Sequence, residues 1–277
     1  MKNSRFFQLL MVLAGLAACT ERYDIELDSS YARLVVDGKV TSDSLQHTLR
    51  LTTSTSYFYN EEPPAVTGAA VRLYDGEESI PYVEDAQRPG YYHAAEAFAG
   101  KAGRLYRIEI ELAAPVGDFS SYEASSLMPL TFGRIDSITL KYEPSFDFYL
   151  LNLFATDPAT TDFYKFDAYV NGKILTDTAS RALVTDDKFF NGNNTNGLPV
   201  MFFRGDEIKP GDTITLQLAA ITEDYYRFFL ELQTGSGSSN PLFSGPAANI
   251  RTNVSNGALG YFAAARLARA SLIVPQN

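Results

Sequence analysis

The sequence predicts a mainly β protein with two β-sandwich-like domains behind a removable N-terminal segment. Apolar residues alternate with polar ones over short stretches, which is the period of a strand with one buried face. Turn-forming Gly, Asp and Asn recur between these stretches about every 8–12 residues, a spacing typical of sandwiches and barrels. The 277-residue chain is 45% hydrophobic. This is enough apolar material to form cores, so extended disorder is excluded.

The first 18 residues predict a signal peptide. Two basic residues precede an apolar run at 6–16, which is shorter than the ~20 residues that a permanent membrane helix needs. The run ends in Leu16, Ala17, Ala18 and Cys19, and Cys19 is the only cysteine of the chain. These four residues resemble the lipobox of bacterial lipoproteins, in which small residues fit the signal peptidase and the thiol accepts diacylglycerol. The alternative is an ordinary secretory signal with a chance cysteine.

Cleavage before Cys19 predicts a lipid-anchored protein. Thr20 stands where an Asp would retain a lipoprotein in the inner membrane, so the outer membrane is expected, and Glu21 gives partial support for the cell surface over the periplasmic face. Each buried acyl methylene contributes about 0.8 kcal/mol, so several acyl chains anchor firmly. Residues 19–30 are polar and acidic, and we expect them to form a tether. No later stretch has ~18 apolar residues in a row, so the lipid is the only expected membrane contact.

The charge of the chain excludes nucleic acid as a partner. Cleavage reduces Lys+Arg from 23 to 21 against 33 Asp+Glu, a net charge of -12 in place of -10. Binding to nucleic acid requires a basic surface that replaces phosphate counterions. A single cysteine also excludes intramolecular disulfides and cysteine-clustered metal sites.

Residues 31–128 predict a sandwich of the immunoglobulin or transthyretin-like kind, with about seven short strands. The alternation is clearest at 103–112, and the stretch 69–74 leads into Asp75-Gly76, a strong hairpin signal. Pro129 marks the joint to the next unit, because proline cannot continue strand pairing.

Residues 129–277 predict a second β-rich domain with one helix near 222–234. Thr222 can cap this helix, and aromatic residues follow it at helical spacing. We expect the helix to cover one end or face of the sandwich; docking of a partner is the alternative. The expected strands are 135–142, 146–155, 163–170 and 213–221.

The chain resembles, over nearly its whole length, the outer-membrane lipoproteins of Bacteroidota grouped as domain-of-unknown-function family 4249. Members are typically encoded beside TonB-dependent transporters. The resemblance therefore implies an accessory or binding subunit of an outer-membrane uptake system, with such a transporter as partner, and it implies no enzymatic activity. It rests on 34–38, 68–75, 197–200, 211–213 and, most specifically, the stretch Asn253 to Phe262 with its Asn-x-x-Asn-Gly-x-Leu-Gly-Tyr-Phe pattern.

Catalytic motifs are missing from the sequence, so a non-enzymatic function is expected. There is no Gly-x-Ser-x-Gly elbow, His-Glu-x-x-His zinc motif or phosphate-binding loop. A Ser-His-Asp triad has only His47 and His93 available as base, and both lie in expected strands where a structural role is favoured. A hydrolase remains the alternative.

The loop 185–197 admits three interpretations. Carboxylate and amide oxygens are calcium ligands, which makes Asp186, Asp187, Asn191 and Asn193 candidates for a Ca²⁺ site; no other cofactor is expected. Dense Asn and Gly also suit a plain long turn. The third interpretation is contact with a ligand or partner through Phe189 and Phe190.

Other candidate sites lie on loops and strand junctions. Tyr57, Phe58 and Tyr59 approach a loop tip at Pro63-Pro64 and are candidates for an exposed aromatic contact, with core packing as the alternative. They motivate a second functional hypothesis, a free-standing surface lipoprotein that binds glycans or peptides. Asp-Ser/Thr triplets resemble the O-glycosylation sequon of exported proteins in the same bacterial group, or arise by chance, at Ser44, Ser137, Thr178 and Thr213.

Overall fold

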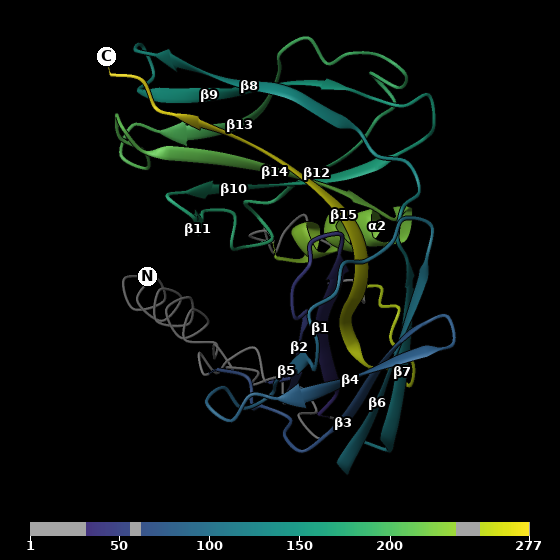
Figure 1. Cartoon of the computed structure of the whole chain (residues 1–277). Coiled ribbons are helices and arrows are strands. Elements are labelled where there is room, and N and C mark those ends of the chain that lie inside the picture. The colour runs from purple at the N-terminus through teal and green to yellow at the C-terminus, as the bar shows by residue number, and fades with distance from the viewer. Residues whose placement is uncertain (1–31, 56–61, 237–249, 277) are drawn as a thin grey trace, which may run out of the picture. The chain divides into compact units, whose positions relative to one another are not determined.

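The chain is described by a computed structural model that covers residues 32–55, 62–236 and 250–276 (Figure 1). The predicted signal peptide 1–18 and the tether 19–30, including Leu16, Ala17, Ala18 and Cys19, lie outside the described residues. Tyr57, Phe58 and Tyr59 also lie outside them. The expectations for these segments therefore stay predictions.

The described residues form two sheets and one long helix, α2 (Glu223–Ser236). A smaller sheet contains three strands: β8 (Arg134–Glu143), β9 (Phe148–Thr156) and β13 (Leu198–Arg204). The strands of the larger sheet are β1 (Leu34–Thr41), β2 (Thr48–Thr53), β3 (Ala70–Asp75), β4 (Glu78–Glu84), β5 (Tyr91–Ala94), β6 (Leu105–Val116), β7 (Phe119–Leu127), β10 (Phe163–Val170), β11 (Lys173–Ile174), β12 (Leu183–Asp186), β14 (Thr213–Ile221) and β15 (Leu259–Ile273).

The larger sheet has the order β11-β10-β14-β15-β1-β2-β5-β4-β3-β6-β7, with β12 paired to β10, and the smaller has the order β13-β9-β8. The predicted fold class, mainly β and sandwich-like, is confirmed. No helix within the described residues has the length and apolar character needed to cross a membrane.

The first core lies among β1 to β7, which curl so that their inward residues face one another. Buried tyrosines do much of the filling, because the chain has no tryptophan. Three of these phenols have a polar partner: Tyr92 Oη donates to the Val66 carbonyl at 2.9 Å, Tyr122 Oη donates to that of Val116 at 2.9 Å, and Tyr106 Oη accepts from the Lys101 amide at 2.7 Å. These bonds remove the penalty of burying a hydroxyl.

The second core lies between the smaller sheet and the inner face of β10 and β14. Strand β14 is buried on both faces from Leu216 to Ile221, since Leu216 and Leu218 face this core while Ala219 and Ile221 face α2. The double burial explains why the stretch is nearly continuously apolar rather than alternating.

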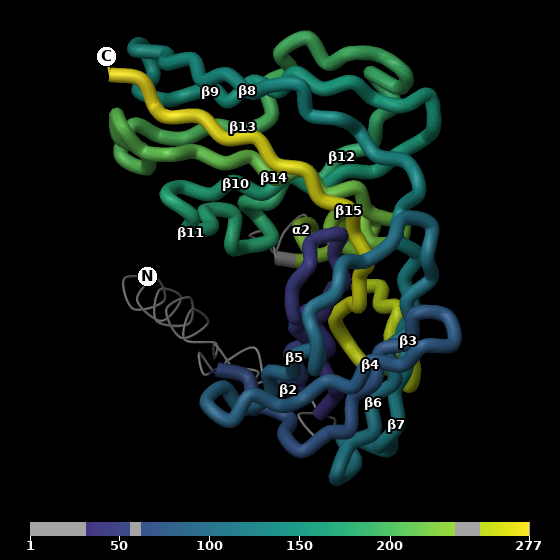
Figure 2. Tube along the Cα trace, in the orientation of Figure 1, coloured from purple at the N-terminus to yellow at the C-terminus, as the bar shows by residue number. Residues whose placement is uncertain are grey.

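Strand β15 belongs to both cores. Its first half pairs in parallel with β1, from Val35 opposite Leu259 onward, and its second half pairs antiparallel with β14. Figure 2 shows this yellow segment running from one group of strands to the other. Phe262 and Ala264 consequently enter the first core. The predicted boundary at residue 128 separates most strands of the first core from those of the second, but β15 lies after this boundary and contributes to both cores. The division into two separate domains stays a prediction.

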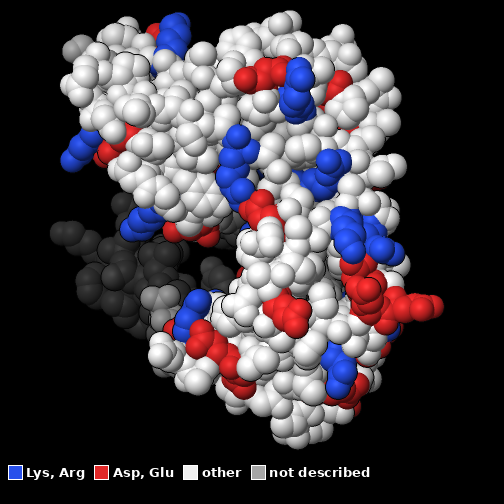
Figure 3. All heavy atoms as spheres, viewed as in Figure 1, with Lys and Arg blue, Asp and Glu red and all other residues white. Residues whose placement is uncertain are grey.

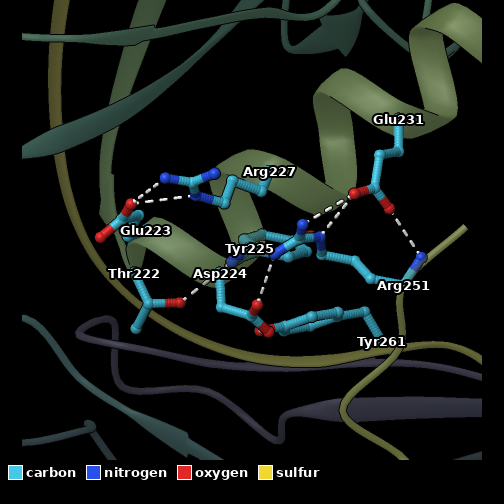
Figure 4. A network of polar contacts seen from close by, with 8 residues as sticks. All are labelled: Thr222, Glu223, Asp224, Tyr225, Arg227, Glu231, Arg251 and Tyr261. Atoms are coloured by element: carbon cyan, nitrogen blue, oxygen red, sulfur yellow. Dashed lines mark hydrogen bonds and ion pairs between the residues drawn. The ribbon is translucent and has the colours of Figure 1, made fainter.

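Helix α2 packs on the face of the larger sheet that is turned away from the second core. Thr222 caps it as expected, since its Oγ1 accepts a hydrogen bond from the Tyr225 amide at 3.2 Å. Figure 4 shows how Arg251 holds the helix: its guanidinium binds Asp224 at 2.8 Å and Glu231 at 2.7 Å, while Tyr261 donates to Asp224. The helix thus covers a sheet face rather than standing free.

Gly260 is expected to be indispensable to the junction of β1 and β15. Its φ is +83°, and a Cβ placed there would lie 2.0 Å from the Val36 carbonyl oxygen. Gly260→Ala should therefore lower the free energy of unfolding by about 3 kcal/mol or more, measured by urea unfolding. Gly257→Ala is the matched control: its φ is +68° with open space around the Cβ, and a loss of only about 1 kcal/mol is expected. Equal losses would contradict the steric argument.

Candidate functional site

An aromatic cluster lies on the solvent side of the smaller sheet; we call Phe146, Phe148 and Phe202 the outer aromatic face. Phe146 is 76% exposed and Phe202 is 66% exposed. The rings of Phe146 and Phe148 stack with centroids 5.9 Å apart, and Phe202 meets Phe148 edge to face at 5.8 Å. Exposed aromatic clusters of this kind mark interaction surfaces in soluble domains.

Local strand geometry produces this face. Along β9, Tyr149 and Leu151 point into the second core, so Phe148 and Leu150 point the opposite way. Phe202 lies directly opposite Leu150 in the β9–β13 register. Only one face of the smaller sheet is covered by the core, which leaves these side chains to the solvent.

Charged side chains form small mixed-sign groups on the face of the molecule seen in Figure 3, with wide uncharged areas between them. Ion pairs between charged side chains are frequent among the described residues, for example Arg181 with Glu207 and Lys188 with Asp186. No extended basic patch is visible on this face.

A cluster of three buried carboxylates lies at one end of the second core. Asp157 directly follows β9, Asp162 directly precedes β10, and Asp187 directly follows β12. The antiparallel register pairs Phe163 with Asp186, which brings Asp162 beside Asp187. One oxygen from each of the three carboxylates lies within 4.8 Å of the others.

Hydroxyl and backbone amide groups donate hydrogen bonds to the carboxylates of Asp162 and Asp187. Asp162 accepts from the hydroxyls of Thr131 and Thr160. Its own backbone amide donates to Asp187 Oδ2 at 2.8 Å. Burial raises the pKa of Asp187, because a carboxylate loses its hydration there and the neighbouring charge of Asp162 repels it.

Asp157 connects this cluster to a cavity. Its Oδ1 accepts a hydrogen bond from Tyr164 Oη at 2.7 Å, and its Oδ2 accepts one from the Gly192 amide at 3.2 Å. Burial raises the pKa of the Asp157 carboxyl, and burial together with this carboxylate raises the pKa of Tyr164.

The cavity beside Asp157 has a volume of about 210 Å³. Its walls are mostly apolar, and the polar side chains among them are those of Thr156, Asp157, Tyr164, Thr185 and Thr195. Typical small-molecule pockets occupy ~300 Å³ or more, so this one suits only a small guest. It is lined by Gly133, Leu153, Ala155, Thr156, Asp157, Tyr164, Phe166, Leu183, Thr185, Phe190, Thr195, Leu198, Pro199, Val200 and Leu218.

The loop 187–197 folds back on the end of β9 and contributes Phe190 and Thr195 to the wall of the cavity. The Asp157 amide donates to the Asn193 carbonyl at 3.1 Å, and the Thr195 amide donates to the Ala155 carbonyl at 2.9 Å. Gly192 has φ +74°, a conformation that glycine adopts without strain. The loop is therefore held in place by backbone hydrogen bonds.

Of the four calcium candidates named from the sequence, only Asp187 belongs to the carboxylate cluster. The Asp186 carboxylate instead pairs with Lys188 Nζ at 2.7 Å. Asn191 and Asn193 are exposed, and the side chain of Asn193 donates to the Asn191 carbonyl. Sequence reasoning missed Asp157 and Asp162, which lie in a different loop; no spacing within the chain signals that they approach Asp187.

The two phenylalanines at the tip of this loop differ in environment. Phe189 is 98% exposed, whereas Phe190 packs against the second core and lines the cavity. Only Phe189 is thus available for contact from outside. The four predicted glycosylation residues, Ser44, Ser137, Thr178 and Thr213, are all exposed.

The two histidines lie in the first core and at its surface. His47 is buried against Phe98, with its Nε2 3.0 Å from the Phe98 carbonyl oxygen. His93 is half-buried between Thr48 and Asp85, at 3.1 and 3.4 Å. His93 lies in β5 and contacts Thr48 of the neighbouring strand β2, whereas His47 directly precedes β2 and contacts Phe98 outside the named strands.

These features define a mainly β protein with an exposed aromatic surface and a small, partly polar cavity. A family model described as a domain of unknown function (DUF4249) matches residues 20–270, and the chain belongs to that family. A comparison with curated proteins finds no match.

Solved structures with some likeness include a chain of a cytokine receptor complex (12% identity, TM-score 0.23, covering 67% of this chain and 82% of that one). Another is a three-domain fragment of the outer capsid protein Hoc of bacteriophage RB49, at 11% identity and TM-score 0.23, covering 88% and 71%. At these TM-scores neither likeness bears on function.

The buried His47 predicts a pH-dependent stability. Burial lowers the pKa of this imidazole, against a weaker upward effect of the hydrogen bond to Phe98. The neutral imidazole therefore contributes fully to the free energy of unfolding at a pH above the ordinary histidine pKa of about 6.5. This contribution is lost as the pH falls towards the lowered pKa of His47. When the pH is lowered from about 7.5 to about 5, the melting temperature of His47→Gln should fall less than that of the wild type. A fall in the melting temperature of His47→Gln as large as that of the wild type would refute the assignment.

Proposed function

We propose that the protein is a lipid-anchored outer-membrane binding or accessory subunit that associates with a TonB-dependent transporter in nutrient uptake. The outer aromatic face carries this proposal, because it offers a surface where a macromolecular partner can bury Phe146 and Phe202. Catalysis is not part of the proposed function.

The energetics of such a surface support a binding role. Phe146 and Phe202 are held in place by ring contacts with Phe148, so little conformational entropy would be lost when a partner covers them. Aromatic side chains buried at the centre of an interface commonly contribute ~2 kcal/mol or more each. Because Phe146 and Phe202 are mostly exposed in the free protein, a partner that buries them would gain this binding free energy.

The membrane part of the proposal is supported by the N-terminal sequence. Leu16-Ala17-Ala18-Cys19 follows a short apolar run, as in lipoprotein signals. The family resemblance adds the expectation of a neighbouring transporter. A free-standing surface protein that binds glycans is the second candidate, because aromatic rings such as the 98% exposed Phe189 also suit stacking against sugars.

The double variant Phe146→Ser/Phe202→Ser should no longer co-purify with the transporter. An affinity-tagged chain is purified from the native membrane in mild detergent, and the co-purifying β-barrel is quantified by mass spectrometry. We expect at least a tenfold loss, which corresponds to about 1.4 kcal/mol. Phe119→Ser, at a 44% exposed phenylalanine of β7, is the matched control and should retain the transporter. A wild-type chain isolated as a monomer, or full retention by the double variant, would refute the association.

Binding to a glycan array that is lost on substituting Tyr57 to Tyr59 or Phe189 would favour the second candidate.

Cys19→Ser should abolish lipid attachment. Cells fed labelled palmitate are expected to label the wild-type chain and not the variant, because a hydroxyl does not replace the thiol as acceptor. The variant should also keep its signal peptide and migrate as a larger species. Ala17→Ser, which keeps a small residue, is expected to remain labelled. Labelling of Cys19→Ser would contradict the predicted lipobox.

A further inference from the structure

The carboxylate cluster at the end of the second core groups three acidic side chains that are almost fully buried. Asp157, Asp162 and Asp187 have exposed fractions of 5%, 6% and 0%. Within residues 32–55, 62–236 and 250–276, no Lys, Arg or His forms an ion pair with any of the three. Lys188, the nearest basic residue along the chain, pairs with Asp186 instead. Three adjacent buried carboxylates without a counter-charge are strongly disfavoured unless a cation or protons neutralise them.

One oxygen of the cluster has no partner at all. Asp187 Oδ1 is fully buried, and no described group donates a hydrogen bond to it. Leaving such an acceptor unsatisfied costs about 1–3 kcal/mol, and more when the group is charged. The other oxygen of the same carboxylate is fixed by the Asp162 amide at 2.8 Å, so the side chain is held within the cluster and cannot turn away to solvent. An ion within the cluster would satisfy this atom.

We propose that Asp157, Asp162 and Asp187 together bind one Ca²⁺ ion. The ligand set is all oxygen, which favours a hard cation over zinc or copper. Three carboxylates from three chain segments suit the irregular, multi-carboxylate coordination of Ca²⁺, whereas Mg²⁺ keeps several waters and commonly takes one or two carboxylates. The site is independent of the outer aromatic face and of the membrane partner.

The hydrogen bonds around the cluster preorganise these ligands. Tyr164 and Gly192 orient Asp157, and Thr131 and Thr160 orient Asp162. Such supporting bonds hold carboxylates in position and keep their remaining lone pairs free for the ion. Because Asp187 begins the loop 187–197, bound Ca²⁺ would fasten that loop across the cavity.

Calcium titration of the full-length chain tests the site directly. The protein is purified in detergent, treated with a chelator and titrated with CaCl₂ in a calorimeter, with MgCl₂ in parallel. We expect one equivalent of Ca²⁺ to bind with a Kd no weaker than about 10⁻³ M, and the melting temperature to rise with CaCl₂. Absence of both signals in the wild type, or equally tight binding of Mg²⁺, would overturn the proposal.

Matched amide variants locate the ion. Asp187→Asn keeps the shape of the side chain and removes its charge, so Ca²⁺ affinity should fall roughly tenfold or more. Asp186→Asn changes the adjacent carboxylate outside the cluster and should bind Ca²⁺ like the wild type. If Asp187→Asn does not fold, as judged by circular dichroism, Asp162→Asn takes its place. Wild-type affinity in a folded cluster variant, or loss of binding in Asp186→Asn alone, would refute the site.

Discussion

The insertion of β15 between β1 and β14 is the constraint on which the rest of the structure depends. It turns two groups of strands into one continuous sheet, and it requires Gly260, where the backbone passes close to the Val36 carbonyl. Asn253 fixes the approach: its side chain donates to the carbonyls of Ser125 and Phe262 and accepts from the Phe262 amide. The most specific motif of the sequence, 253–262, is thus the one that places this strand.

Much of the second core could be predicted because its strands carry local signals. The expected strands 163–170 and 213–221 coincide with β10 and β14, and Asn171-Gly172 forms a turn with both φ values positive. Strand β15 was not predicted. Its stretch Phe262 to Ala270 is rich in small residues and is buried on both faces in its first half, so it shows no alternation. Its pairing with β1, in which Val35 lies opposite Leu259, joins distant parts of the chain and depends on tertiary packing that no local pattern encodes.

The candidate sites could be predicted only in fragments, for the same reason. Asp187 stood out in an Asn/Gly-rich loop, but its neighbours Asp157 and Asp162 come from another connection that the β10–β12 register brings alongside. Phe146 and Phe148 lie two positions apart in the sequence, while Phe202 joins them through the pairing of β9 with β13. In each case the residue types were evident from the sequence, and the grouping was supplied by strand register.

The place of β15 also bears on how the chain acquires its structure. Residues near the C-terminus, including Val254, Ala258 and Phe262, complete a core whose other members lie before residue 129. The first strands made therefore cannot bury their apolar faces fully until nearly the entire chain has been synthesised or exported. Contacts of such high sequence separation slow folding, so the two halves are expected to become stable together rather than in the order of synthesis. Loss of the last strand would leave both cores open at once.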